Sequence, residues 1–395
     1  YELPPNVEAK TAETKKRLGK HVPREDSVPS WTPLIIRRGG KCGEIDIIPI
    51  SELAEFTEDE QLIEIDDIEV FNAKNWDTDK VWSKIKWVKR HPSYKHKILR
   101  INTVGGLVDV TDNHSILSPN GRVLKASDIK VGSKVWTIGY KHAWIRTRKQ
   151  QYFIGTEDWA WFLGLFAAEG SAPRNSLLVE ISNQDLDLLM KAKEIAEKHT
   201  NLTWRIRSAN NCYKLSVCSK PLHELFRSWF YTKQDYLKRV PKCILNAPLN
   251  IKEKFLEGYF RGDGSNKKAY RFSGFSTNSP ILATGIIWLV NQIEKRSVCV
   301  NVRNNNPYSF DINLNKGDNR KDRSLVKKIF ELPYEGYLYD IETEDHTFVA
   351  GVNCKVHNTA SITTGKVDPK FWNGLVYIIY DILYLDGEEL VDKPY

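Results

Sequence analysis

Hydrophobic and polar positions divide this chain into stretches with different periodicities. Between Leu34 and about Tyr140, short apolar runs alternate with turn residues, as in LIIRR, EIDIIPI, IEVFN, KILRINTV and KVWTIGY. Runs of this kind predict β-strands. The same rhythm returns after Leu332, in GYLYDIETEDHTFVAGVNCKVHN. The pattern therefore predicts a β-rich domain whose strands come from two separated parts of the chain.

The stretch between these parts has a mixed rhythm that begins near Asp158. It predicts helices at 161–169, 185–199 and 222–230, and strands at 177–182, 203–207 and 213–217. A similar series follows, with strands at 270–276, 298–304 and 308–314 and helices at 281–295 and 324–330. Because the order of elements recurs, the sequence predicts an inserted α+β domain with two related halves.

Two segments of this inserted domain, FLGLFAAEGS (162–171) and FLEGYFRGDGS (255–265), share one pattern. Each has two small residues four positions apart on one helix face, followed by Glu169 in the first copy and Asp263 in the second. Small residues let two helix backbones approach closely, which would bring both carboxylates to one end of the pair. Adjacent carboxylates favour a bound cation. A metal-dependent reaction is expected, and the alternative is two buried helices with acidic caps.

Length and composition narrow the class of protein. A chain of 395 residues exceeds the usual size of a single core, and 41% of its residues are hydrophobic. No apolar run is long enough for a membrane span, and the N-terminal residues lack the apolar segment of a signal peptide. We therefore expect a cytoplasmic protein that binds no membrane. Six cysteines are scattered without CxxC pairs, which argues against a zinc site and a disulfide framework.

The net charge of +8 suits a polyanionic partner. Basic residues alternate with apolar ones along several predicted strands, so that one face of a sheet would be positively charged. The candidate DNA contacts are Arg205, Arg207, Lys214 and Arg303. A solvated sheet face is the alternative for each of them.

The paired helical segments resemble the motif of the LAGLIDADG homing endonucleases. This resemblance implies two αββαββα halves related by a pseudo-two-fold axis, in a monomer that cleaves double-stranded DNA at the uninterrupted host-gene site. It implies that Glu169 and Asp263 bind Mg²⁺ and are catalytic. Lys238, in the segment LKRVP, matches a basic position near the active site of that family. A lysine that contacts only phosphate is the alternative.

Four segments of the β-rich parts resemble the sequence blocks of inteins. They are SVPSWTPLII (27–36), TDNH (111–114), YDIETEDHTFVAG (339–351) and VHNT (356–359). The resemblance implies an all-β Hint (horseshoe) splicing domain that the endonuclease domain interrupts. The expected divisions are a host flank at 1–26, Hint parts at 27–145 and 331–358, an endonuclease domain at 146–330, and a second host flank at 359–395.

At the N-terminal junction, the resemblance assigns Ser27 as the nucleophile that attacks the carbonyl of the preceding residue. Thr111 and His114 would hold that carbonyl and protonate the departing nitrogen. Cys42 is a rival first nucleophile, because many inteins begin with cysteine. Its spacing disfavours it, since position 47, where the family pattern has threonine, is isoleucine.

At the C-terminal junction, the resemblance assigns Thr359 as the second nucleophile and Asn358 as the residue that cyclises to a succinimide. His357 and His346 would polarise the carbonyl of Asn358, and Asp340 would assist Thr359. No cofactor is expected for splicing.

Two other functions fit parts of this pattern. A Hedgehog-type autoprocessing domain would cleave without ligation and would not need the pair Asn358–Thr359. A DNA-binding maturase with an inactive nuclease would have lost one of the two acids. The flanks resemble DNA ligase or terminase segments only over short stretches, so the sequence does not identify the host protein.

Overall fold

The structure is a computed structural model that describes most of the chain. The described residues are 26–40, 43–73, 81–93, 96–138, 155–234, 236–265, 272–294, 297–314 and 322–358, together with the backbone of 384–385 and 388–389. The chain divides into two compact units, of which the larger is Arg24–Thr359. In the smaller unit, Tyr1–Pro23 with Ala360–Tyr395, the described backbone forms the strand pair β22 (Tyr384–Leu385) and β23 (Glu388–Glu389).

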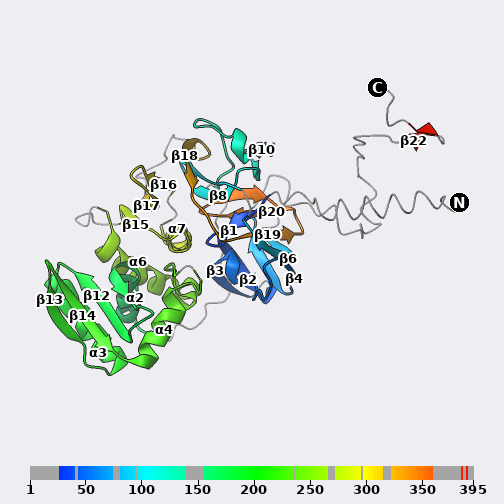
Figure 1. Ribbon diagram of the computed structural model, residues 1–395. Coiled ribbons are helices and arrows are strands. Elements are labelled where there is room, and N and C mark those ends of the chain that lie inside the picture. Colours follow the sequence, from blue (N-terminus) through cyan, green and yellow to red (C-terminus); the bar gives the residue numbers. More distant parts are fainter. Residues whose placement is uncertain are drawn as a thin grey trace. The chain divides into compact units, whose positions relative to one another are not determined.

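Strands from both ends of the larger unit share the same sheets, as the blue and orange strands of Figure 1 show. The largest sheet has the order β1 (Val28–Pro29), β19 (Tyr337–Thr343), β6 (Trp82–Pro92), β5 (Ile68–Phe71), β2 (Pro33–Arg38) and β3 (Glu44–Pro49), with β4 (Gln61–Glu64) paired to β6. A second sheet has the order β10 (Val123–Lys125), β9 (Ser115–Leu117), β21 (Cys354–His357) and β20 (Thr347–Ala350). A third consists of β18 (Val326–Leu332), β7 (Ile98–Thr103) and β8 (Leu107–Thr111). This is the interrupted β domain that the hydrophobic pattern predicts.

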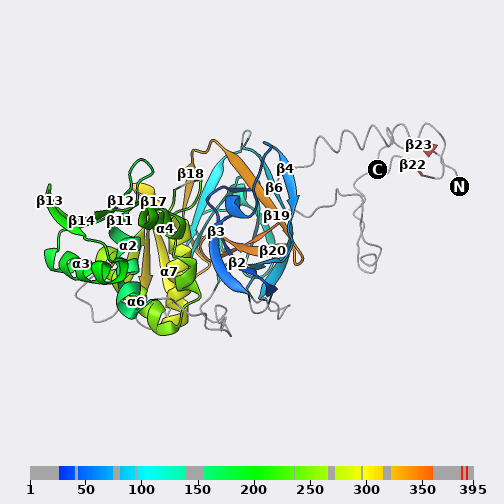
Figure 2. The same cartoon turned by 90° about the horizontal axis from the view of Figure 1, so that it is seen from below.

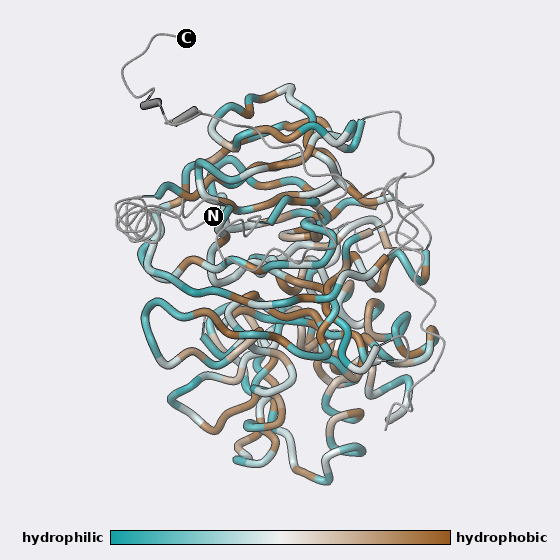
Figure 3. The backbone as a smooth tube through the Cα atoms, turned by 90° about the vertical axis from the view of Figure 1, so that its right-hand side faces the viewer, coloured by the Kyte–Doolittle hydropathy of each residue, from teal (hydrophilic) through white to brown (hydrophobic). Residues whose placement is uncertain are grey.

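The core of the β domain follows from the alternation of side chains along its strands. Figure 3 shows hydrophobic and hydrophilic positions alternating along the tube. Strands from before and after the insertion contribute to one cluster of buried residues, which includes Val28, Leu34, Ile36, Ile85, Val88, Val108, Val110, Ile341 and Val356. Neither part of the β domain can bury these residues without the other.

The inserted domain begins with α2 (Glu157–Glu169), whose N-cap Thr156 accepts a hydrogen bond from the backbone N–H of Trp159. Its first half continues with β11 (Gly170–Ser171), β12 (Leu178–Asn183), α3 (Leu186–Thr200), β13 (Arg205–Ala209), β14 (Cys212–Cys218), α4 (Lys220–Phe230) and α5 (Lys242–Leu245). Its second half consists of α6 (Leu249–Asp263), β15 (Gly274–Thr277), α7 (Pro280–Ile293), β16 (Val298–Arg303) and β17 (Asn306–Leu314). The helices α2 and α6 lie side by side, and each half has its own antiparallel sheet (Figure 2).

Two buried amide side chains tie the inserted domain to the β domain. Asn246 accepts a hydrogen bond from the backbone N–H of Ile45 at 3.0 Å and donates one to its carbonyl at 2.8 Å. Asn102 donates to the carbonyl of Val300 at 3.1 Å and accepts from the N–H of Val302 at 3.3 Å. Each amide replaces a strand partner, so the unpaired backbone groups of β3 and β16 stay satisfied when buried.

The sequence expectation for residues 324–330 was wrong. This stretch was expected to be the closing helix of the second half, but Val326–Leu332 is strand β18, which pairs with β7 of the β domain. The free edge of β7 offers backbone hydrogen bonds that outweigh the weak helix propensity of the segment. Among the described residues the second half therefore lacks the final helix of the expected αββαββα series. Because β18 pairs with β7, residues 326–330 belong to the β domain, although the expected boundary placed these residues in the insertion.

Two further differences concern strands of the β domain. The pattern did not predict β6, because its lysines and arginine dilute the hydrophobic signal over Trp82–Pro92. KVWTIGY was expected to be a strand, but its described residues form only isolated bridges, at Lys134 and Thr137.

In the described part of the chain, no helix combines the length and apolar character needed to cross a membrane.

The buried lysine of α6 gives the folding equilibrium a testable dependence on pH. Lys252 is 2% exposed and its ammonium donates to the Oε1 of Gln292 at 2.8 Å. Burial lowers its pKa to about 8. Between this value and the pKa of a free lysine, the unfolded chain binds more protons than the folded chain, so stability rises with pH.

In the unaltered chain, the free energy of unfolding should rise between pH 7 and 9.5. In Lys252→Met this rise should be smaller by on the order of 1–3 kcal/mol. Chemical denaturation at both pH values measures this increase. Lys254→Met is the matched control, because Lys254 is partly exposed and paired with Glu257 at 2.9 Å. An identical pH dependence in Lys252→Met and the unaltered chain would contradict the assignment.

Candidate functional site

The N-terminal junction lies inside the β domain. Ser27 is fully buried directly before β1. Both the backbone N–H and the hydroxyl of Thr111 donate to the carbonyl of Ser27, at 3.1 and 3.3 Å. Thr111 therefore holds the carbonyl of Ser27, one residue beyond the Asp26 carbonyl that the sequence expectation assigned to it.

Asp26 adopts a left-handed backbone conformation with φ of 72°. A non-glycine residue in this region costs roughly 1 kcal/mol or more. Its carboxylate accepts a hydrogen bond from the backbone N–H of Ser115 and lies 3.6 Å from Nδ1 of His114. The peptide bond before Ser27 is thus held at a strained residue by groups from the β8–β9 turn.

His114 is buried beside this junction. Its Nδ1 donates to the carbonyl of Ser115 at 3.1 Å, and its buried Nε2 has no hydrogen-bond partner in the described part of the chain. Burial lowers the pKa of His114, although Asp26 and Asp340 act to raise it, and His357 acts to lower it further. The ring is therefore uncharged for most of the time at pH 7. These influences also mean that groups from both junctions lie close to one imidazole.

The C-terminal junction approaches the same region, because β21 pairs with β9 next to His114. Asn358 is 1% exposed, and its backbone N–H donates to the carbonyl of His346 at 3.1 Å. The Nδ1 of His357 donates to the carbonyl of Asn358 at 2.6 Å. Both polar atoms of the Asn358 side chain are buried without a hydrogen bond to any described residue. The expected second nucleophile, Thr359, and the rival Cys42 lie outside the described residues.

Of the expected splicing residues that the structure describes, all but His346 bring their side chains to this buried region. The side chain of His346 is exposed, so this residue contacts Asn358 through its backbone. Asp340 is 7% exposed on β19, and its Oδ1 makes no hydrogen bond to the described residues.

His91 belongs to this pocket and was missed by the sequence reasoning. Its Nε2 lies 2.9 Å from the Oγ of Ser27 and 3.4 Å from Oδ2 of Asp340. It sits near the end of β6, opposite Leu338 and two positions from Asp340 in the register with β19. Recognition of β6 as the partner of β19 would have placed this histidine opposite the junction.

A second cluster lies where α2 and α6 end. The helices touch backbone to backbone through their glycines, as the small-residue pattern predicts. A Cβ placed on Gly164 would lie 1.9 Å from the carbonyl oxygen of Phe255, and one on Gly258 would lie 1.9 Å from that of Trp161. No larger residue fits at either position without separating the helices.

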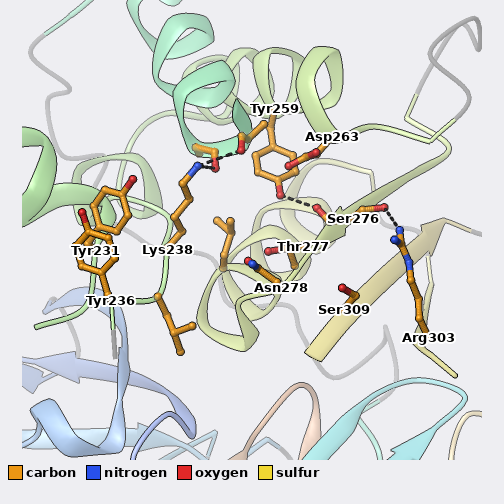
Figure 4. A pocket seen from close by; sticks show the side chains of 14 residues that line it. Tyr231, Tyr236, Lys238, Tyr259, Asp263, Ser276, Thr277, Asn278, Arg303 and Ser309 are labelled. Carbon is orange, nitrogen blue, oxygen red and sulfur yellow. Dashed lines mark hydrogen bonds between the residues drawn. The ribbon is translucent and has the colours of Figure 1, made fainter. Parts of the chain in front are cut away.

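This contact brings the two acids together. Glu169 and Asp263 are the last residues of the two helices, and a Cβ on Gly262 would lie 2.8 Å from Cγ of Glu169. Asn183 donates to Oε1 of Glu169 at 3.1 Å. Asp263 lines a cavity of about 490 Å³ together with Lys238, Tyr259, Thr277 and Arg303, as Figure 4 shows.

Lys238 closes the end of α2. Its ammonium donates to the carbonyls of Phe166, Ala167 and Ala168 at 3.3, 3.0 and 3.0 Å. Burial lowers its pKa to about 8, and the nearby Asp263 and Glu169 act against this shift. Lys238 therefore lies near both acids, as expected, but its hydrogen bonds also satisfy carbonyls that the helix leaves unpaired.

The expected DNA contacts lie on two sheets. Arg207 stands opposite Lys214 in the register of β13 and β14, and Arg205 lies two positions away on the same face. Both arginines are exposed, while Lys214 pairs with Glu180 at 2.8 Å. Arg303 is exposed on β16 and pairs with Asp311 at 2.7 Å. The first sheet thus presents a basic face, whereas the charge of Arg303 is balanced by its neighbour.

Two carboxylates meet at the ends of α2 and α6. Among the described residues, no group of three or more histidine, cysteine or acidic side chains could hold a metal. Mg²⁺ is commonly bound by only one or two carboxylates, with phosphate oxygens and water completing its octahedron. The neighbouring Glu169 and Asp263, of which Asp263 lines the cavity, form a donor set of this size.

The helix contact predicts a large loss of stability for one added methyl group. Gly258→Ala should lower the free energy of unfolding of the inserted domain by roughly 3 kcal/mol or more, because its Cβ meets backbone rather than a flexible side chain. Tryptophan fluorescence during chemical denaturation measures the change. Glu257→Ala, one residue away on the outer side of α6, should be close to neutral. Equal stability of both variants would mean that α2 and α6 do not pack through this glycine.

Several known proteins match this chain in sequence. No family model matches the chain. A DNA polymerase of Acanthamoeba polyphaga mimivirus is 29% identical over 410 residues, which cover 95% of this chain and 22% of the polymerase. A replication factor C small subunit of Methanocaldococcus jannaschii is 28% identical over 302 residues, covering 67% of this chain and 16% of that protein. The chain thus spans only about a fifth of the length of these relatives.

Solved structures of low overall similarity include a mesophilic variant of the homing endonuclease I-DmoI, with 16% identity and a TM-score of 0.32 over 40% of this chain and 84% of that one. A transcription factor IIB Mvu mini-intein has 12% identity and a TM-score of 0.31 over 85% of this chain and 100% of that one. The sequence motifs, the sheets shared by both ends of the larger unit and the paired acidic helices of the insertion are the features in which this chain resembles an intein that carries a homing-endonuclease domain.

Proposed function

We propose that the chain is a self-splicing intein that excises residues 27–358 and ligates its two flanks. The observation that carries this proposal is the meeting of both junctions at one buried pocket. Ser27 and Asn358 are 331 positions apart in the sequence, yet both lie in strands or strand ends that border His114. A pocket that holds both junction peptide bonds supports a reaction that joins the flank before Ser27 to the flank after Asn358.

In the first step, Oγ of Ser27 attacks the carbonyl carbon of Asp26, and the amide becomes an ester. The left-handed conformation of Asp26 raises the energy of the amide before the reaction. Thr111 fixes the backbone of Ser27, and His114 lies against the Asp26 carboxylate. These two residues hold the scissile amide in place while its carbon–nitrogen bond breaks.

In the later steps, the Thr359 hydroxyl takes over the N-terminal flank, and the Asn358 side-chain nitrogen attacks its own backbone carbonyl. His357 donates a hydrogen bond to this carbonyl and so makes its carbon more electrophilic. The Asn358 amide is buried without partners among the described residues, so no hydrogen bond there has to break before it attacks. Oδ1 of Asp340 makes no hydrogen bond to the described residues, which suits it to accept the hydroxyl proton of Thr359.

The different names of the relatives support the proposal that this chain is an element that moves between genes. The chain matches part of a protein named as a DNA polymerase and part of one named as a replication factor C small subunit. One sequence that recurs inside two differently named proteins is expected of an insertion that removes itself after translation.

For the inserted domain we propose a double-strand DNA endonuclease that acts at the uninterrupted host-gene site. Glu169 and Asp263 would bind Mg²⁺, which when bound supplies a polarised water and neutralises charge on the leaving oxygen. Lys238 holds the end of α2 and keeps positive charge beside the phosphate that would occupy the cavity. The exposed Arg205 and Arg207 would contact the DNA backbone.

The two halves of the domain would be related by a pseudo-two-fold axis along the glycine contact. Their local environments support this relation. Gly170 and Gly264 each follow an acid, and a Cβ on either would meet a phenylalanine ring, at 2.2 Å for Phe166 and 2.3 Å for Phe260. With both halves in one chain, a single copy would span both strands of the duplex, and its affinity should fall steeply with salt.

A Hedgehog-type domain that cleaves without ligation is the alternative for the β domain. It requires nothing of Asn358, whereas the buried Asn358 amide and the His357 hydrogen bond are features of a second cleavage site.

Splicing predicts two separate products that mass spectrometry can distinguish from the precursor. The unaltered chain should yield residues 27–358 and the ligated flanks. Asn358→Ala should abolish the ligated product and leave the C-terminal flank attached, because no succinimide can form. The control Asn353→Ala removes a nearby asparagine of the β20–β21 turn and should leave ligation active. Persistence of full-length precursor alone, in the unaltered chain at several pH values, would refute splicing.

Nuclease activity predicts that the two acids are each required. Glu169→Gln and Asp263→Asn should each reduce cleavage of a plasmid carrying the uninterrupted host gene by at least about 100-fold in Mg²⁺. Both substitutions nearly preserve shape, so circular dichroism should be unchanged. Glu257→Gln, on α6 but away from the helix end, is the control for charge. Undiminished cutting by Glu169→Gln would move the active site elsewhere.

A further inference from the structure

We propose that His91 is the general base that activates Ser27, and that Asp340 stabilises the imidazolium it becomes. This inference rests on the proposed splicing function and adds a residue that the intein-like sequence segments do not contain. It starts from the contact between the Ser27 hydroxyl and the ring of His91, at 2.9 Å between Oγ and Nε2.

The hydrogen bonds of His91 determine which ring nitrogen carries the proton. Its Nδ1 lies 3.0 Å from the carbonyl oxygen of Pro92, which can only accept. Nδ1 must therefore be the donor, and in the neutral ring Nε2 carries the lone pair that accepts. The Ser27 hydroxyl then donates to Nε2, which is the orientation a general base needs.

The surroundings make a protein base necessary. Ser27 and the His91 side chain are both 0% exposed, so bulk water does not reach the hydroxyl. Serine is a weak nucleophile at its ordinary pKa and depends on an adjacent base. His114, the other imidazole of the pocket, directs Nδ1 to the Ser115 carbonyl and lies against Asp26 instead of the Ser27 hydroxyl.

Asp340 completes the arrangement. Its Oδ2 lies 3.4 Å from Nε2 of His91, so an imidazolium formed at that nitrogen has a carboxylate beside it. A buried positive charge without such a partner would be costly. Because Oδ1 of the same carboxylate has no hydrogen-bond partner in the described residues, Asp340 can stabilise His91 without giving up its proposed role toward Thr359.

The step balances without an external acid or base. Nε2 of His91 takes the proton from Oγ while Oγ forms a bond to the carbonyl carbon of Asp26, and the carbonyl π electrons move to oxygen. When that electron pair returns, the carbon–nitrogen bond breaks and its pair stays on the nitrogen of Ser27. This nitrogen takes the proton from the imidazolium, which leaves an ester, a free amine and neutral His91.

The test isolates the first step in the full chain. Asn358→Ala with Thr359→Ala stops the later steps, and hydroxylamine then releases residues 1–26 as a hydroxamate that mass spectrometry quantifies. Adding His91→Gln should slow this release by about 100-fold or more. His96→Gln is the matched control, because His96 is a partly exposed histidine that pairs with Asp112 instead. Its release rate should stay within about two-fold of the parent.

A second background separates a base from a structural residue. A thiol is already a few per cent ionised at pH 7 and is far more nucleophilic, so in Ser27→Cys the loss caused by His91→Gln should shrink to about ten-fold or less. An equal loss in both backgrounds, or an unchanged rate with Ser27, would overturn the role of His91 as the base. Release from Ser27→Ala at the parental rate would instead overturn the proposed splicing function itself.

Discussion

The pairing of strands from opposite ends of the larger unit is the constraint on which the rest of this structure depends. β1 pairs with β19 and β21 pairs with β9, so residues near 28 and near 356 are held in sheets with partners far away in the sequence. Closing such long loops costs conformational entropy, which grows only slowly with loop length. The shared hydrophobic cluster supplies the favourable term, because neither part of the β domain buries its apolar face alone.

This pairing also explains why the insertion is tolerated. Most of one large cluster of buried residues belongs to the inserted domain, around the contact between α2 and α6, and residues of the β domain such as Ile45, Phe71 and Val349 pack into the same cluster. Asn246 and Asn102 satisfy backbone groups at the boundary, where a strand of one domain ends against the other. Two functions can therefore share one chain, since the glycine contact positions the acids independently of the strands that position Ser27.

The pocket of the β domain differs from an ordinary core in its unsatisfied polar groups. Nε2 of His114, Oδ1 of Asp340 and the amide of Asn358 are buried without hydrogen-bond partners among the described residues. Each such group costs about 1–3 kcal/mol in a folded protein. Together with the left-handed Asp26, they form a high-energy site that the surrounding sheets hold in place. Such a site suits bond exchange, because it offers donors and acceptors that the reaction can use.

The sequence by itself determined the interrupted β domain, the paired helices and most of the candidate residues, because these depend on local periodicity and on residue types at set spacings. Pairs of small residues four positions apart predicted the contact at Gly164 and Gly258 correctly. Tertiary structure decided what depends on partners distant in the sequence. Val326–Leu332 is a strand because β7 has an open edge, His91 enters the pocket because β6 lies beside β19, and His346 contributes its backbone because its side chain faces solvent. Local periodicity carries no information about these partners, since each arises only when strands from separate parts of the chain meet.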